Sequence, residues 1–159
     1  MNDTLRASLL VLTTLLTLLA ACASPELVDP PPSLQGTWVG EGRVHVEWVR
    51  RKRLAVSLTI TEDGAVTGRV GDAQLLDAHV RPNRSDLGRT LGVWTDWAVE
   101  GRLDGELLAD EQFVAQRVLI PFDFFAGRIE GRVHAEGAFL DGRRRGGRLD
   151  AVEMTLVRR

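Results

Sequence analysis

The sequence contains few or none of several residue types that mark common protein classes. It has one cysteine, no tyrosine and a single lysine, Lys52, among its 20 basic residues. A single cysteine excludes a disulfide framework within the chain. The absence of tyrosine argues against a polar-ligand pocket walled by tyrosine rings. The net charge of -2 argues against nucleic acid as the main partner, because phosphate binding favours a basic balance.

Signatures of catalysis are also missing. The sequence has no Gly-x-Ser-x-Gly motif and no phosphate-binding loop. Its three histidines, His45, His79 and His134, are widely spaced, and we expect each on the polar face of a different strand rather than in a zinc site. We therefore predict a protein that is not an enzyme and that holds no metal or cofactor.

The lone cysteine ends a short apolar segment at the beginning of the chain. Arg6 precedes residues 7–19, which are apolar apart from Ser and Thr, and Leu19-Ala20-Ala21-Cys22 follows. The apolar run is too short to span a bilayer and ends in small residues, as a signal peptide does. An ordinary secretory signal with a chance cysteine is the alternative interpretation.

The tetrapeptide Leu19-Ala20-Ala21-Cys22 resembles the lipobox of bacterial lipoproteins. The resemblance implies cleavage before Cys22, diacylation of its thiol and, often, acylation of its new amino group. Two or three acyl chains, at ~0.8 kcal/mol per buried methylene, anchor a domain stably to a membrane. Ala23 follows instead of the Asp that resembles an inner-membrane retention signal, which favours the outer membrane, facing the periplasm.

These features divide the chain into three parts. We predict a signal peptide with a signal helix over residues 1–21, a lipidated cysteine with a proline-rich tether over residues 22–35, and one domain over residues 36–159. Four of the six prolines, at positions 25 and 30–32, lie in the tether. Such a segment is typical of an extended or disordered stalk.

Apolar and polar residues alternate with a period of two through the domain, which predicts strands. We expect them over residues 43–48, 54–61, 66–70, 74–80, 97–103, 107–108, 114–122, 126–136 and 151–157. About eight to ten strands fit the domain. We predict an all-β, antiparallel up-and-down meander that closes into a small barrel, with a sandwich as the alternative. Glycines inside strands, such as Gly68, Gly101 and Gly131, suit the bends of a barrel.

The domain opens with Gly36-Thr37-Trp38-Val39-Gly40, which resembles the Gly-x-Trp motif at the first strand of lipocalins and other calycins. The resemblance implies that Trp38 plugs the closed end of a barrel. It also implies that an arginine near the last strand, Arg158 or Arg159, packs on this ring.

Two basic runs fall in predicted turns. The first holds Arg50, Arg51, Lys52 and Arg53, and the second holds Arg143, Arg144 and Arg145. In an eight-stranded meander both turns lie at the end opposite Trp38, where they would form a cationic rim for an anionic ligand or an acidic partner. Solvated turns are the alternative. One additional strand within residues 106–125 would place the two runs at opposite ends.

The aromatic residues also allow two interpretations. Trp97, Phe122 and Phe124 either line a pocket or fill the core of the barrel. Residues 122–125 cannot place all their rings on one strand face, so an exposed ring there would mark a partner or membrane contact.

Two functional hypotheses follow from these patterns. The first is an envelope lipoprotein whose lipocalin-like barrel binds a small apolar or amphipathic ligand. The second is a protein-interaction module with a filled barrel, such as an assembly accessory or an inhibitor of an envelope hydrolase. In both, the N-terminal lipid anchor makes the membrane one partner, and the basic rim faces away from that membrane.

Overall fold

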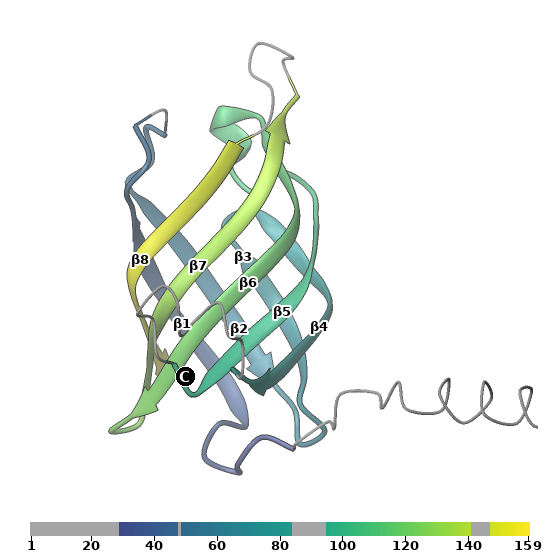
Figure 1. Cartoon of the computed structure of the whole chain (residues 1–159), viewed down its shortest axis with the longest axis vertical. Coiled ribbons are helices and arrows are strands. Elements are labelled where there is room, and N and C mark those ends of the chain that lie inside the picture. Colours follow the sequence, from purple (N-terminus) through teal and green to yellow (C-terminus); the bar gives the residue numbers. More distant parts are fainter. Residues whose placement is uncertain (1–28, 48, 84–94, 141–146) are drawn as a thin grey trace, which may run out of the picture.

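Eight antiparallel strands form a closed barrel (Figure 1). The computed structural model describes residues 29–47, 49–83, 95–140 and 147–159. The strands are β1 (Gly36–Val44), β2 (Arg53–Ile60), β3 (Ala65–Val70), β4 (Ala73–Pro82), β5 (Trp97–Asp104), β6 (Phe113–Phe125), β7 (Arg128–Phe139) and β8 (Gly147–Arg158), with one 3₁₀ turn, η1 (Ala109–Glu111). This confirms the predicted all-β meander and sets the number of strands at eight.

The first strand closes the barrel by pairing with both of its neighbours. Trp38 lies opposite Leu58 of β2 on one side and opposite Arg158 of β8 on the other. No strand of the sheet therefore keeps an unpaired edge, which removes a site of edge-to-edge aggregation. Bulges interrupt the register near Asp77 and Glu153, both with positive φ, and such bulges increase the local bend that closure needs.

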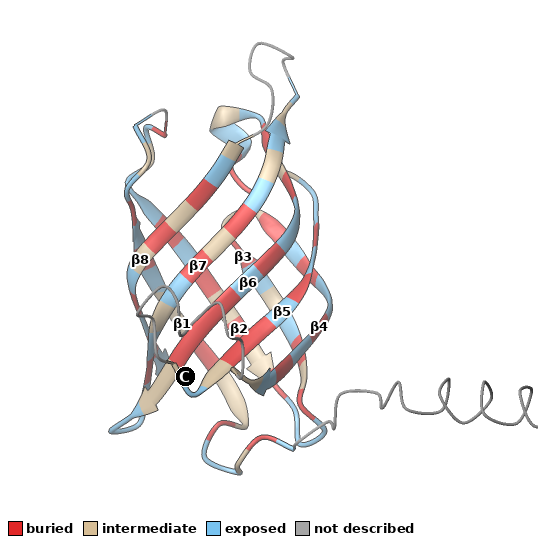
Figure 2. Cartoon of the chain, in the orientation of Figure 1, coloured by how far each residue is buried: buried red, intermediate tan, exposed pale blue. Residues whose placement is uncertain are grey.

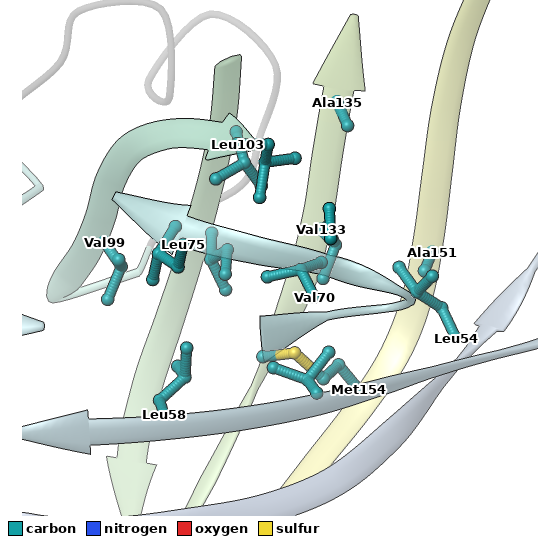
Figure 3. Close-up of a cluster of buried hydrophobic side chains, with 14 of the residues drawn as sticks. Leu54, Leu58, Val70, Leu75, Val99, Leu103, Val133, Ala135, Ala151 and Met154 are labelled. Carbon is teal, nitrogen blue, oxygen red and sulfur yellow. The ribbon is translucent and has the colours of Figure 1, made fainter. Parts of the chain in front are cut away.

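The period-two pattern places apolar side chains inside and polar ones outside. In β2 the buried residues Leu54, Val56, Leu58 and Ile60 alternate with exposed or half-buried neighbours. Figure 2 shows the same alternation along the other strands. In Figure 3, side chains from several strands point into one shared interior. Among the described residues, no polar or charged side chain is fully buried.

The even strand count gives the barrel two distinct ends. β1, β3, β5 and β7 finish at one end, which we call the mouth end (top in Figure 1). The N-terminal segment, residues 29–35, and the finishes of β2, β4, β6 and β8 lie at the other, which we call the closed end. The connection that contains Arg50–Arg53 therefore lies at the mouth end, opposite Trp38. Arg143, Arg144 and Arg145 lie outside the described residues.

Two predicted strand segments were wrong. Residues 45–47 leave the sheet, because β1 follows the register of β2, which begins at Arg53 opposite Arg43. Leu107 and Leu108 form a loop with one isolated bridge to Phe113, and they are buried by tertiary packing rather than by alternation. The predicted signal helix and Cys22 lie outside the described residues. In the part of the chain that is described, no helix is long and apolar enough to cross a membrane.

Candidate functional site at the two ends of the barrel

A tryptophan seals the closed end. Trp38 is only 1% exposed, and its indole N–H donates a hydrogen bond to the Leu34 carbonyl over 2.8 Å. The ring of Phe124 meets it edge-on, with centroids 5.7 Å apart. Leu34 is itself fully buried, so the N-terminal segment folds across this end of the barrel.

An arginine from the last strand lies over the same ring. The Arg158 guanidinium is 4.9 Å from the Trp38 centroid, within the range of a cation–π contact. It also donates hydrogen bonds of 2.7 Å to the carbonyls of Ser33 and Gln35. Of the two candidate arginines, Arg158 thus occupies the place that the calycin resemblance implies. The arrangement ties the N-terminal segment to β8.

Three apolar side chains from connections cover the mouth end. Val49 lies between β1 and β2, and Leu107 and Leu108 lie between β5 and β6. All three are at most 1% exposed and belong to the core cluster. The N–H groups of both leucines donate to the Phe113 carbonyl, and η1 follows them. We call these three residues the mouth cap.

Arg51 fastens the mouth cap to neighbouring turns. Its guanidinium donates to Asp72, in the β3–β4 turn, over 3.0 Å and also pairs with Asp110 in η1. Asp72 in turn accepts a 3.0 Å hydrogen bond from the Ala109 N–H. Partial burial acts to raise the pKa of Asp72, but the Ala109 N–H and the Arg51 and Arg69 charges together hold that pKa below its ordinary value. The hydrogen bond from Arg51 to Asp72 raises the pKa of the Arg51 guanidinium.

The remaining described cations of the predicted rim also have partners. The Arg50 backbone N–H donates to Glu111 over 2.9 Å, the Arg50 guanidinium lies 3.9 Å from the same carboxylate, and Arg53 pairs with Glu41. Lys52 Nζ donates to the Val49 carbonyl over 2.6 Å. Each described cation of the first basic run therefore has an acceptor within this chain, which reduces the positive potential available to an anionic ligand.

An open groove lies along this connection, at the mouth end of the barrel. It has a volume of about 390 Å³, and buried Val44 and half-buried Val46 form its apolar part. Its other lining residues are polar: Arg43, His45, Glu47, Lys52 and Arg53. We call it the mouth groove. It combines an apolar floor with charged walls at the end far from the N-terminal segment.

The aromatic residues divide between core and surface. Phe122 is fully buried, while Trp97 and Phe124 are half-buried and pack against the core. Phe125, the last residue of the aromatic run, is 69% exposed. Trp48 and Trp94 lie outside the described residues. Packing therefore accounts for Trp97, Phe122 and Phe124, and leaves Phe125 as the unexplained ring.

The histidines lie on outer faces. His45 and His79 are exposed, and His134 on β7 is half-buried beside Asp150 of β8, with 2.5 Å between His134 Nδ1 and Asp150 Oδ1. Arg148 donates to the same carboxylate over 3.0 Å. The described residues hold no group of three metal-ligating side chains.

Sequence reasoning did not find the acidic partners of Arg51. Asp72 and Asp110 lie 21 and 59 residues from it along the chain, and no local motif connects them. Only the glycine–aspartate turn at residues 71–72 marks the position of Asp72, as a turn and not as a partner.

Comparison of the chain with known protein families, with curated proteins and with solved structures finds no match.

Proposed function

We propose that this chain is a lipid-anchored envelope protein and a non-enzymatic protein-interaction module. A calycin-type barrel with a filled interior acts as a rigid support, and the partner protein binds its outer surface at the mouth groove. The lipobox resemblance at Cys22 supports the anchor. The packing of the barrel interior is the observation that carries the choice of an interaction module.

Tight packing of the described core residues supports a filled interior. Its buried cluster draws aliphatic and aromatic side chains from all eight strands. A methyl group added at Gly101 would lie 2.5 Å from the Ala78 Cβ, and one added at Gly42 would lie 3.2 Å from the Ala151 Cβ. Both distances are shorter than ordinary van der Waals contact, so neighbouring atoms already fill these positions. This packing supports a function that is carried by the outer surface of the barrel.

The mouth groove is a concave site outlined by described residues of β1, β2 and their connection. It lies at the end opposite the tether, so a partner in the periplasm would reach it without meeting the anchoring bilayer. Apolar Val44 and Val46 beside Lys52 and Arg53 suit an extended protein segment that carries apolar and acidic side chains. The carboxylate of that segment would compete with Glu41 for Arg53.

Charge reversal at the groove tests the proposal. A photo-crosslinking residue placed at Glu47 in the full chain, in its native envelope, should give one discrete protein adduct. Lys52→Glu with Arg53→Glu should abolish that adduct. The matched control, Arg81→Glu, reverses a paired arginine on the outer wall and should leave the adduct unchanged. An adduct that survives the groove reversal, or the absence of any protein adduct, would contradict the proposal.

Ligand binding inside the barrel is the second candidate, and the construction of the mouth cap favours it. The cap consists of connections rather than strands, and partly exposed ion pairs of Arg51 hold it in place. A small apolar ligand would enter by displacing Val49, Leu107 and Leu108. This lipocalin-like function predicts that a lipid-like molecule co-purifies with the chain, whereas an interaction module predicts none.

A further inference from the structure

We propose that the tip of the β6–β7 hairpin, led by Phe125, inserts into the surface of the bilayer that anchors the chain. The barrel would then sit on the membrane by its closed end instead of moving freely on its tether. This inference rests on the lipid anchor of the proposed function.

Phe125 is part of a row of outward-facing side chains across three strands. It lies opposite Arg128 of β7, and Arg128 lies opposite Val157 of β8. Residues that are directly opposite in an antiparallel sheet project from the same face. Phe125 and Val157 are 69% and 53% exposed, so the row presents two apolar side chains to solvent. We call these three residues the tip patch.

The local backbone keeps Phe125 on the outside. Its neighbour Phe124 turns toward the core and contacts Trp38, so alternation directs Phe125 outward. Ala126 and Gly127 both have positive φ, at 50° and 77°, as a tight two-residue hairpin turn requires. A turn this short prevents the Phe125 ring from folding back over the end of the barrel.

The anchor is close to this end of the barrel. Arg158 ties Ser33 and Gln35 to the closed end, so the tether leaves the barrel there. Six residues lie between Cys22 and Asp29, where the described chain begins, so the two Cα atoms are at most about 25 Å apart when this segment is fully extended. Figure 1 places the β6–β7 turn at the same end as this N-terminal segment. The tip patch is therefore within reach of the bilayer.

The charges near the patch point to contact with the apolar part of the interface rather than with anionic headgroups. Arg128 already pairs with Glu130 over 2.9 Å. At this end, Arg158 and Arg159 are offset by three acidic residues: Glu62 and Asp63 in the β2–β3 turn and Asp123 near the hairpin tip. An exposed phenylalanine with an arginine stem beside it suits the boundary of headgroups and acyl chains. Contact should therefore depend little on salt or on anionic lipid.

Leu140 provides a matched control at the opposite end. It follows β7 at the mouth end and is 62% exposed, close to the value for Phe125. β6 has 13 residues, which span roughly 40 Å at about 3.3 Å per residue. A barrel that sits on its closed end would keep Leu140 well away from the bilayer.

Fluorescence quenching tests the proposal in the full lipidated chain. Phe125→Trp and Leu140→Trp proteins would be reconstituted into phosphatidylcholine vesicles with brominated acyl chains, and the emission of the parent chain subtracted. The tryptophan at position 125 should lose most of its added emission, as expected at about 5–10 Å depth. The tryptophan at position 140 should lose none. High salt should leave both results unchanged. Unfolding curves that match the parent would show that both variants fold.

The other outcomes are distinct. Vesicle-bound protein with no quenching at position 125 would overturn the seating and leave the lipid anchor intact. Equal quenching at positions 125 and 140 would overturn the seating by the closed end. A tryptophan at position 125 that is shielded only when envelope proteins are added would assign the tip patch to a protein partner and overturn the membrane contact. A chain that does not bind vesicles at all would overturn the anchor, and this inference with it.

Discussion

The closed end and the mouth end of the barrel are sealed by different means. At the closed end, the seal belongs to the sheet itself: Trp38 lies on β1, and Arg158 lies opposite it on β8. At the mouth end, the seal is made of connections, with Val49, Leu107 and Leu108 as the cap and Arg51 as the fastening.

This difference predicts unequal resistance to opening. Partly exposed ion pairs contribute little, typically 0.2–1 kcal/mol, and salt screens them. Burial of a large aromatic ring contributes several times more. We therefore expect the mouth end to open before the closed end in local fluctuations, although both ends cover the same core.

Removal of the tryptophan plug should have the largest effect. Trp38→Ala deletes a ring that is 1% exposed, together with its hydrogen bond to Leu34 and its contact with Arg158. The free energy of unfolding should fall by about 3–5 kcal/mol, measured by urea denaturation. Trp97→Ala is the control, because Trp97 is only half-buried and its loss should cost less. Equal losses would contradict the special role of Trp38.

Overpacking the wall between the two ends should have the next largest effect. In Gly101→Ala the new methyl group would lie 2.5 Å from the Ala78 Cβ, which is too close without movement of the backbone. The free energy of unfolding should fall by about 1–3 kcal/mol. If the substitution left stability unchanged, the interior would have space that the filled-barrel account denies.

Loss of the mouth fastening should have a smaller effect that depends on pH. Asp72→Asn removes a carboxylate whose pKa is held below its ordinary value of 3.8 by the Ala109 N–H and Arg51. At a pH above 3.8, the ionised Asp72 carboxylate therefore stabilises the folded state. This stabilisation is lost as the pH falls through the pKa of Asp72 in the folded state. The side chain is 37% exposed, so we expect a loss of about 1 kcal/mol or less near neutral pH.

The comparison with the parent chain checks the sign. Denaturation of the two chains should differ near pH 7 and converge in acid, once Asp72 is protonated in the folded as well as the unfolded state. A difference between the chains that grows on acidification would reverse the assigned pKa direction.

A substitution in the hairpin turn at the closed end should have the smallest effect on the free energy of unfolding, and it should raise it. Ala126 adopts a φ of 50°, a left-handed conformation that asparagine and glycine tolerate better than alanine. Ala126→Asn should raise the free energy of unfolding by about 0.5–1 kcal/mol. Ala126→Val is the opposite control and should lower it, because a β-branched side chain is strained at this φ. Thermal unfolding would rank the three chains.

The barrel itself was predictable because its strands alternate cleanly. In β2 every second residue is apolar and buried, and the Glu62-Asp63-Gly64 turn begins the next strand. The short Gly-x-Trp motif led to the prediction that Trp38 closes one end of the barrel. The position of the first basic run at the mouth end was also predictable, because alternate connections of an eight-stranded meander lie at the same end.

The mouth was not predictable, because tertiary contacts decide it. Leu107 and Leu108 look like a strand in sequence, but they bend over the core to cover it. Arg50, Arg51 and Arg53 look like a free cationic rim, but acidic residues from other connections and from β1 pair with them. The alternation of apolar and polar residues does not show which loop residues fold over the core. It also does not show which residue, distant in sequence, pairs with a given charge.

Native mass spectrometry of the full chain, purified from its envelope and followed by lipid extraction, tests the central claim most directly. A barrel that is filled by its own side chains should give the mass of the acylated chain, with no additional molecule released by extraction. A lipid or metabolite bound in a one-to-one ratio, and lost on extraction, would contradict the filled barrel and favour ligand binding beneath the mouth cap.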